Sequence, residues 1–331
     1  METPWGNETQ HFFTLTPDLI LRAVESAGYR CTGRSFTLYS MENRVYSVEI
    51  ETEDTSNRWA GYRIVKFYRP GRWSREQILE EHQFLADLIA DEVPVVPVLP
   101  VGKGSTLGVE PETGLFFAIY PRIGGRIPDE IAPNDLPIVA RLLARLHATG
   151  RSIPTKHRIQ LTPETYGQRN LQYLLGANII PREFEQQYAD LVGELVVKTT
   201  PWFAAASYQR IHGDCHRANL LWGNDGPFWL DFDDMVMGPA VQDMWLLIHG
   251  IEKPGHIRDT FLDAYEEFAS FDYATLKLIE PLRALRYIHF AAWIAKRWED
   301  PTFPNAFPQF GQRSYWQGQI DDLREQLEKL G

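Results

Sequence analysis

Apolar residues follow a helical period and then a strand period near the start of this chain. Residues 17–27 predict a helix, with Thr16 as N-cap, Pro17 at its first position and Gly28 after its end. The apolar positions recur at helical spacing: Leu19, Ile20, Ala23, Val24 and Ala27. The segments "SFTLYSMENRVYSVEIE" and "RWAGYRIVKFY" read as strands separated by a polar turn. We expect these two strands to form an antiparallel hairpin.

A second helix is predicted for residues 75–91, because Ser74 and Gln77 form the pattern of a capping box. Its apolar positions lie on one face. Short strands are expected near residues 95–101 and 115–120. The first 120 residues therefore read as a small lobe that mixes helices with an antiparallel sheet.

The segment "PRIGGR", residues 121–126, interrupts this pattern, since proline and paired glycines mark turns and boundaries. Helices dominate beyond it, at about residues 135–149, 181–198, 241–250, 257–268, 274–298 and 313–330. The exception is the stretch 211–234, which reads as strand, polar loop, strand, Gly-rich turn and strand. We predict an α+β, bilobal fold: an N-terminal lobe (1–120), a hinge (121–126) and a mainly helical C-terminal lobe (127–331).

Composition narrows the possible partners. The 331 residues carry a net charge of -11, which disfavours nucleic acid and anionic membranes as partners. The chain has two cysteines, too few for a disulfide scaffold, and "METPWGNETQ" has neither the basic nor the apolar part of a signal peptide. No run of about 18 apolar residues occurs. We therefore expect a cytoplasmic protein without membrane partners, and by default a monomer.

Candidate chemistry gathers in the stretch 211–234. Asp214 and Asn219 lie five residues apart in one polar loop, and Asp231 follows twelve residues later, after a strand, a turn and a strand. A hairpin of that length brings Asn219 and Asp231 to one end. Carboxylate and amide oxygens suit Mg²⁺, and Asp214 could accept a proton from a hydroxyl, as phosphoryl transfer requires.

Two other chemistries compete for the same loop. A zinc site could use His212, Cys215 and His216, but their spacing is not that of ordinary zinc ligands. Cys215 as a nucleophile has no independent support, and a buried thiol is the simpler interpretation. We expect His212 to brace the loop through hydrogen bonds.

The motifs "HGDCHRAN", "LDFDD" and "GPAVQDMWLL" resemble the catalytic loop and metal-binding segment of the protein-kinase-like fold. The variant is that of aminoglycoside phosphotransferases, choline kinases and homoserine kinases. The resemblance implies that Asp214 is the catalytic base and that Asn219 and Asp231 hold Mg²⁺, with Asp231 also counted among the catalytic residues. It implies that Asp243 begins a buried helix and binds the catalytic loop. Further motifs, "SMENRVY", "QILEEHQFLADL" and "LIEPLRALR", resemble bacterial Ser/Thr protein kinases of this family that act in stress responses.

The same resemblance implies a nucleotide site for ATP in the N-terminal lobe. Lys66 would pair with the α- and β-phosphates, and its carboxylate partner would be Glu80 or Glu81. We prefer Glu81, because Leu85 and Leu88 follow it at the spacing of the family's pattern. Lys66 also stands among apolar strand residues, where a charged group needs an ionic partner.

Two weaker assignments complete the nucleotide site. Ser40 would lie in the turn that covers the phosphates, and Tyr120 to Ile123 would contact adenine through backbone groups. The chain departs from the family of ordinary protein kinases, because it lacks both G-x-G-x-x-G and the APE motif. Backbone N–H groups of any turn can bind phosphate, but Glu42 is unexpected there and should point away.

We therefore expect an ATP- and Mg²⁺-dependent Ser/Thr protein kinase that also phosphorylates itself. The alternative is a small-molecule kinase that acts on an amino alcohol or a sugar. A third hypothesis is a nucleotide-binding pseudokinase scaffold, which the intact lysine, aspartates and asparagine disfavour. Asp233 and Asp234 are either close neighbours of the site or caps of the following turn.

Overall fold

The computed structural model describes residues 12–13, 15–55, 57–102, 104–248 and 254–331. The chain forms two compact units. The first comprises Met1–Thr149, Thr155–His157 and His216–Asp234, and the second comprises Gly150–Pro154, Arg158–Cys215 and Met235–Gly331. The segment 121–126 lies within the first unit, and its role as a hinge stays a prediction.

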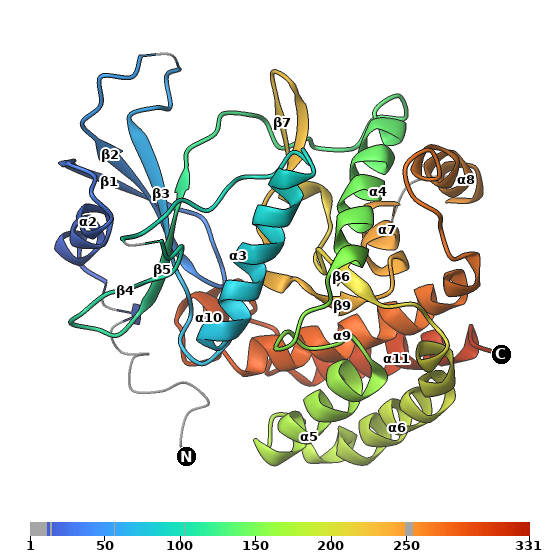
Figure 1. The fold of residues 1–331 in the computed structure, drawn as a ribbon. Coiled ribbons are helices and arrows are strands. Elements are labelled where there is room, and N and C mark those ends of the chain that lie inside the picture. The colour runs from blue at the N-terminus through green and yellow to red at the C-terminus, as the bar shows by residue number, and fades with distance from the viewer. Residues whose placement is uncertain (1–11, 14, 56, 103, 249–253) are drawn as a thin grey trace. The chain divides into compact units, whose positions relative to one another are not determined.

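An antiparallel sheet of five strands forms the centre of the first unit (Figure 1). Its order is β1-β2-β3-β5-β4. The strands are β1 (Cys31–Leu38), β2 (Arg44–Ile50), β3 (Tyr62–Phe67), β4 (Gly108–Val109) and β5 (Phe116–Pro121). β2 pairs with β3 so that Val45 lies opposite Lys66. The antiparallel pairing predicted for these two segments is confirmed.

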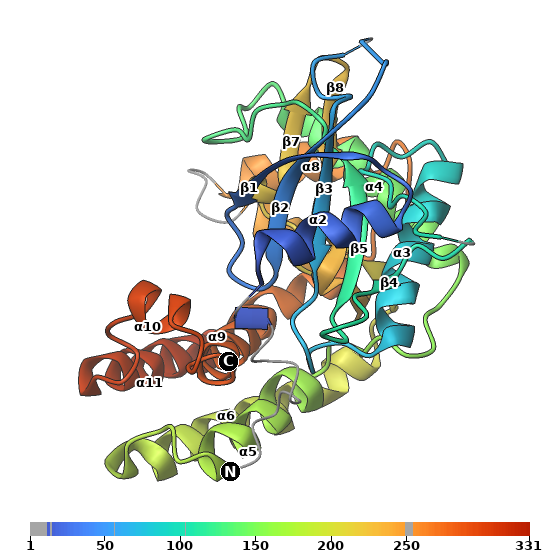
Figure 2. The same ribbon diagram turned by 90° about the vertical axis from the view of Figure 1, so that its left-hand side faces the viewer.

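Two helices cover opposite faces of this sheet (Figure 2). On one face, α2 (Pro17–Ser26) packs its buried residues against apolar side chains of β2, β3 and β5. On the other, α3 (Arg75–Ala90) contributes Ile78 to a smaller cluster with Tyr68 and Ala118. Both helices begin as predicted: Thr16 accepts from Leu19 N–H, and Ser74 and Gln77 form a complete capping box.

The first unit also contains the hairpin of β7 (Leu220–Gly223) and β8 (Gly226–Trp229). It is flanked by two 3₁₀ turns, η2 (Arg217–Asn219) and η3 (Phe232–Asp234). Arg126 exchanges two backbone hydrogen bonds with Trp222, at 2.9 and 2.8 Å, which fastens β7 to the segment after β5. The loop, strand, turn and strand predicted for this part of the chain are thus confirmed.

The second unit is mainly helical, with a two-stranded ladder of β6 (Gln209–Ile211) and β9 (Val236–Gly238). Its helices include α6 (Arg182–Ala204), α7 (Val241–Ile248), α8 (Pro254–Tyr265), α9 (Ile279–Ala295) and α11 (Arg313–Glu328). Most of α4 (Leu136–Ser152) belongs to the first unit, which includes its residues up to Thr149. A helix lies at each of the predicted positions, but α6 extends past the predicted end at Lys198 to Ala204. Gly250, the expected end of another helix, lies outside the described residues. No described helix is both long enough and apolar enough to span a membrane.

Several elements differ from the sequence-based prediction. The stretch taken as one strand, residues 35–51, contributes to two strands, β1 and β2, with a turn between them. Residues 95–101 form only isolated bridges, whereas the short strand β4 was not predicted. The structure adds a π-helical turn (Pro163–Gln168), α5 (Arg169–Gly176) and α10 (Thr302–Ala306), and the predicted helix 274–298 divides into η4 (Tyr273–Leu278) and α9.

Candidate active site

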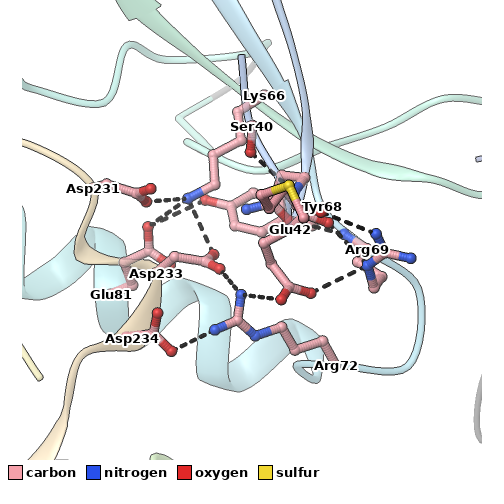
Figure 3. A network of polar contacts seen from close by, with 12 residues as sticks. Ser40, Glu42, Lys66, Tyr68, Arg69, Arg72, Glu81, Asp231, Asp233 and Asp234 are labelled. Carbon is pink, nitrogen blue, oxygen red and sulfur yellow. Dashed lines mark hydrogen bonds and ion pairs between the residues drawn. The ribbon is translucent and has the colours of Figure 1, made fainter. Parts of the chain in front are cut away.

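Lys66 is a buried cation surrounded by carboxylates of the first unit (Figure 3). Its Nζ lies 3.0 Å from Asp233 Oδ1, 3.3 Å from Asp231 Oδ1 and 3.6 Å from Glu81 Oε1. Burial alone lowers the pKa of a lysine, but the attraction of Asp233, Glu81 and Asp231 outweighs it and raises the pKa of Lys66 well above 10.5. The ammonium therefore stays protonated at neutral pH.

The carboxylate of α3 that meets Lys66 belongs to Glu81. Its side chain is buried, and its Oε1 also accepts from Tyr68 Oη at 3.4 Å. The neighbouring Glu80 is engaged elsewhere, because its Oε1 accepts from Lys156 N–H at 2.6 Å and from His157 N–H at 3.0 Å. The geometry thus separates two residues that the sequence left as alternatives, and it agrees with the preference for Glu81.

Asn219 and Asp231 stand at the open end of the β7–β8 hairpin. Leu220 pairs with Trp229, and Leu230 N–H donates to Asn219 O at 2.9 Å, which places the two polar residues beside the last rung. Asp231 has a φ of 54°, the left-handed region that a residue with a Cβ rarely adopts. Its side chain is 54% exposed, unlike that of its neighbour Lys66. Strained backbone of this kind is concentrated at functional sites.

Arg72 links the turn η3 to the rest of the cluster (Figure 3). Its guanidinium forms ion pairs with Asp233 and Asp234, and its Nη1 lies 3.2 Å from Glu42 Oε2. Arg72 and Asp233 are both nearly buried. The sequence alone left the role of these two aspartates open and did not indicate a role for Arg72. Arg72 and Asp233 are 161 residues apart in the chain, so their contact cannot be read from the sequence.

The turn between β1 and β2 is held by side chains. Ser40 Oγ accepts from Asn43 N–H at 3.2 Å, and Asn43 Oδ1 accepts from Arg69 N–H at 3.1 Å. Arg69 also lies 3.2 Å from Glu42 Oε1. Glu42, expected to point away from the nucleotide, points towards Arg69 and Arg72 (Figure 3).

Tyr120 lies at the end of β5, and its hydroxyl contacts Tyr68 Oη at 3.2 Å. The Tyr68 hydroxyl in turn contacts Glu81, so Tyr120 belongs to the same polar network as Lys66. Burial raises the pKa of Tyr120, and its hydroxyl stays protonated. Ile123 is exposed. Contact of either residue with adenine stays a prediction.

Asp214 belongs to the second unit, in the loop after β6. Asp243, in the first turn of α7, accepts from His212 N–H at 2.8 Å and from Gly213 N–H at 2.9 Å. The loop backbone is therefore fixed by a fully buried carboxylate. The side chain of Asp214 forms an ion pair with Arg286 of α9, with Arg286 Nη2 3.0 Å from Asp214 Oδ1.

The donor set at the hairpin suits a hard cation. Asn219 and Asp231 offer an amide oxygen and a carboxylate, and Mg²⁺ commonly uses one or two carboxylates together with phosphate and water oxygens. Among the residues described, no group of three or more His, Cys, Asp or Glu side chains is arranged to hold a metal ion. His216, one of the candidate zinc ligands, accepts from Ala218 N–H through its Nδ1 at 3.2 Å.

Comparison with known sequences identifies relatives along nearly the whole chain. The chain is 38% identical over 327 residues to stress response kinase A of Escherichia coli strain K12, covering 98% of this chain and 96% of that protein. It is also 38% identical over 321 residues to serine/threonine protein kinase RdoA of Salmonella typhimurium strain LT2, covering 96% and 94%. These matches agree with the resemblance seen in the motifs.

Solved structures confirm the fold. Amicoumacin kinase hAmiN, in complex with AMP-PNP, Ca2+ and Ami, matches with a TM-score of 0.70 at 17% identity, over 94% of this chain and 93% of that one. The microcompartment-associated aminopropanol kinase matches with a TM-score of 0.70 at 20% identity, over 96% and 99%. The sequence model of the phosphotransferase enzyme family (APH) matches residues 40–279. The protein is therefore a kinase that belongs to the phosphotransferase enzyme family.

Proposed function

We propose that this kinase transfers the γ-phosphoryl group of ATP, with Mg²⁺, to Ser or Thr hydroxyls of proteins, including its own chain, as part of a bacterial stress response. The acceptor class is supported by the near full-length relationship to proteins named stress response kinase A and serine/threonine protein kinase RdoA.

The observation that carries the proposal is the buried ion-pair cluster around Lys66. A buried, protonated ammonium held by Glu81 and lying next to Asp231 is suited to orient a polyphosphate beside the carboxylate proposed to bind the metal. Phosphoryl transfer asks the protein mainly for such positioning and charge stabilisation. A solvated surface lysine would not need three carboxylates around it.

Each residue then has a separate task. Asn219 and Asp231 hold Mg²⁺, which neutralises charge on the phosphates when it is bound. Asp214 orients the acceptor hydroxyl and takes its proton. The turn that contains Ser40 binds phosphate through backbone N–H groups, and the backbone from Tyr120 to Ile123 contacts adenine.

A second candidate is a kinase of small hydroxylated molecules. It is favoured by the fold shared with enzymes named for amicoumacin and for aminopropanol, although likeness at this identity extends to the fold alone. The two candidates predict the same residues for ATP and differ only in what the Asp214 side chain meets.

The test is transfer of label from γ-labelled ATP with Mg²⁺ to the protein itself, to a generic protein substrate and to a panel of amino alcohols and sugars. Asp214→Asn should reduce labelling of protein by about 10²–10⁴-fold, the usual contribution of a general base. The matched control is Asp225→Asn, because Asp225 is an exposed aspartate in the β7–β8 turn. The control should retain wild-type rates.

Label that appears only on an added amino alcohol or sugar would replace the protein-kinase proposal with the second candidate. Nucleotide binding without transfer to any acceptor would indicate a pseudokinase. Undiminished labelling by Asp214→Asn would remove the role proposed for that carboxylate.

A further inference from the structure

Asp214, the carboxylate proposed as the catalytic base, forms an ion pair with an arginine. Arg286, on α9, places Nη2 3.0 Å from Asp214 Oδ1 within the second unit, and the two side chains are 40% and 26% exposed. This pair is thus open to solvent, in contrast to the buried Glu81 and Asp233 beside Lys66.

The loop backbone does not depend on this ion pair. Asp243 accepts hydrogen bonds from His212 N–H and Gly213 N–H, and Gln242 Nε2 donates to Gly213 O at 3.1 Å. All of these bonds come from α7, so the loop backbone has anchors that do not involve α9. Arg286 therefore acts on the carboxyl group of Asp214 and on whatever approaches it.

The guanidinium of Arg286 has N–H donors that its bond to Asp214 does not use. It carries five N–H donors, and in the described part of the chain its one hydrogen-bond and ion-pair partner is Asp214. The arginine one turn earlier on α9 is different, because Arg283 Nη1 pairs with Glu280 Oε2 at 3.1 Å. Arg286 thus presents a partly exposed guanidinium that can bind a carboxylate with its remaining donors.

This charge bears directly on the acceptor. A hydroxyl that meets Asp214 also comes close to the guanidinium, which repels an ammonium group and attracts a carboxylate. A carboxylate next to the hydroxyl would compete for Arg286 and weaken its ion pair with Asp214 Oδ1, the atom proposed to accept the hydroxyl proton. An acceptor with a cationic neighbour lacks this exchange and leaves the ion pair in place.

We propose that Arg286 is a specificity-determining residue that selects Ser or Thr hydroxyls flanked by acidic side chains of a protein. The inference rests on the proposed function as a protein kinase and names the substrate class for that same site.

The experiment compares peptides with a single serine flanked at the same positions by Glu, Ala or Lys. For the wild type, kcat/KM should fall in that order, with Glu over Ala by roughly tenfold, as expected for one charge-assisted contact. Arg286→Gln should remove this difference mainly through a higher KM for the Glu peptide. Arg286→Glu should invert the order and favour the Lys peptide. The wild-type preference should also shrink in high salt.

The matched control is Arg324→Gln on α11. Arg324 forms an ion pair of the same length, 3.0 Å to Asp321, and its side chain is 45% exposed. It should retain the full preference for Glu peptides, because it lies on a helix without a proposed role in the reaction. Circular dichroism of each variant serves to check that the fold is kept.

Three results would overturn the proposal. If the wild type phosphorylates all three peptides equally, the acceptor is not selected by charge. If Arg286→Gln lowers kcat equally for every peptide, Arg286 only orients Asp214. If a small molecule is labelled but no peptide or protein is, both this proposal and the protein-kinase assignment are wrong. The first two results differ from this one, because they leave the protein-kinase assignment intact.

Discussion

Replacement of Arg72 by methionine tests how the segment that follows Asp231 is held in place. Arg72 joins Asp233 and Asp234 of η3 to Glu42 of the turn between β1 and β2 (Figure 3). Methionine has a similar length and is apolar, so it removes the charge and the hydrogen bonds with little loss of packing.

The expected cost follows from the burial of each partner. Removing one member of a buried ion pair costs about 3–5 kcal/mol, since the remaining charge loses its compensation. Asp233 keeps Lys66 at 3.0 Å, which moves the expectation to the lower end. The side chain of Asp234 is 37% exposed, so water replaces its partner and it adds about 0–1 kcal/mol. We expect a loss of about 3 kcal/mol in the free energy of unfolding of the first unit.

Urea unfolding followed by tryptophan fluorescence measures this loss. Trp73 is a local reporter, because the Arg72 guanidinium lies 5.3 Å from the centre of its ring. A double-mutant cycle with Glu42→Gln should give a coupling energy of about 0.5–3 kcal/mol. The matched control is Arg34→Met, in the same unit, where the arginine is 74% exposed and lies 3.6 Å from Glu49. That variant should stay within about 0.5 kcal/mol of the wild type.

A loss below about 1 kcal/mol, equal within error to that of Arg34→Met, would refute the reasoning. It would mean that the carboxylates of η3 are compensated by water or by Lys66 alone. A zero coupling energy with Glu42→Gln would show that Arg72 does not link the two segments.

Three further predictions concern the second unit and the cysteines. In Asp243→Asn, one of the two N–H donors of the loop, His212 or Gly213, faces an amide N–H₂ in place of a carboxylate oxygen. The free energy of unfolding, measured by thermal unfolding, should fall by about 1–3 kcal/mol, and the rate of phosphoryl transfer should also fall. Burial lowers the pKa of Lys296 from 10.5 to about 8, so the unfolded chain binds more protons than the folded protein between pH 8 and pH 10.5. The free energy of unfolding of the wild type should therefore rise with pH across that window. Urea titrations should show a rise of up to about 3 kcal/mol relative to Lys296→Met. Burial raises the pKa of Cys31 to about 11 and raises that of Cys215 well above its usual value. Iodoacetamide at pH 8 should therefore label Cys31 slowly and Cys215 only after unfolding; rapid labelling of native Cys215 would contradict its burial.

Elements with strong local signals were predicted from the sequence. The N-caps Thr16 and Ser74 begin helices in the structure, because a hydroxyl that accepts from the first turn is a local interaction. The turn between β1 and β2 lacked such a signal, since "LYSMENR" contains neither Gly nor Pro. It is formed by Ser40 accepting from Asn43 N–H and by contacts with Arg69 from a distant strand end. The π-helical turn and α5 were missed because their short patterns depend on packing against other helices.

The site divides in the same way. Spacing within one loop and one hairpin suggested Asp214, Asn219 and Asp231 as candidates, because those positions are close in sequence. It could not indicate that Arg72 or Arg286 lies beside an aspartate, since both contacts join residues far apart in the chain. An arginine beside apolar or aromatic residues, as in "GRWS" and "RALRYIHF", is the signal that could have drawn attention to them.

The balance of charge around Lys66 has a consequence for the nucleotide. Five carboxylates are linked here to three cations, namely Glu42, Glu81, Asp231, Asp233 and Asp234 with Lys66, Arg69 and Arg72. Within these ion pairs the carboxylates outnumber the cations by two, and such an excess would disfavour a bare polyphosphate. Asp231 is its most exposed carboxylate, so a cation from solution meets this oxygen first. A divalent cation matches the excess in charge and prefers hard oxygens. Under the proposed function, we therefore predict that the protein binds a metal–nucleotide complex more tightly than free ATP, even though Lys66 alone would attract either.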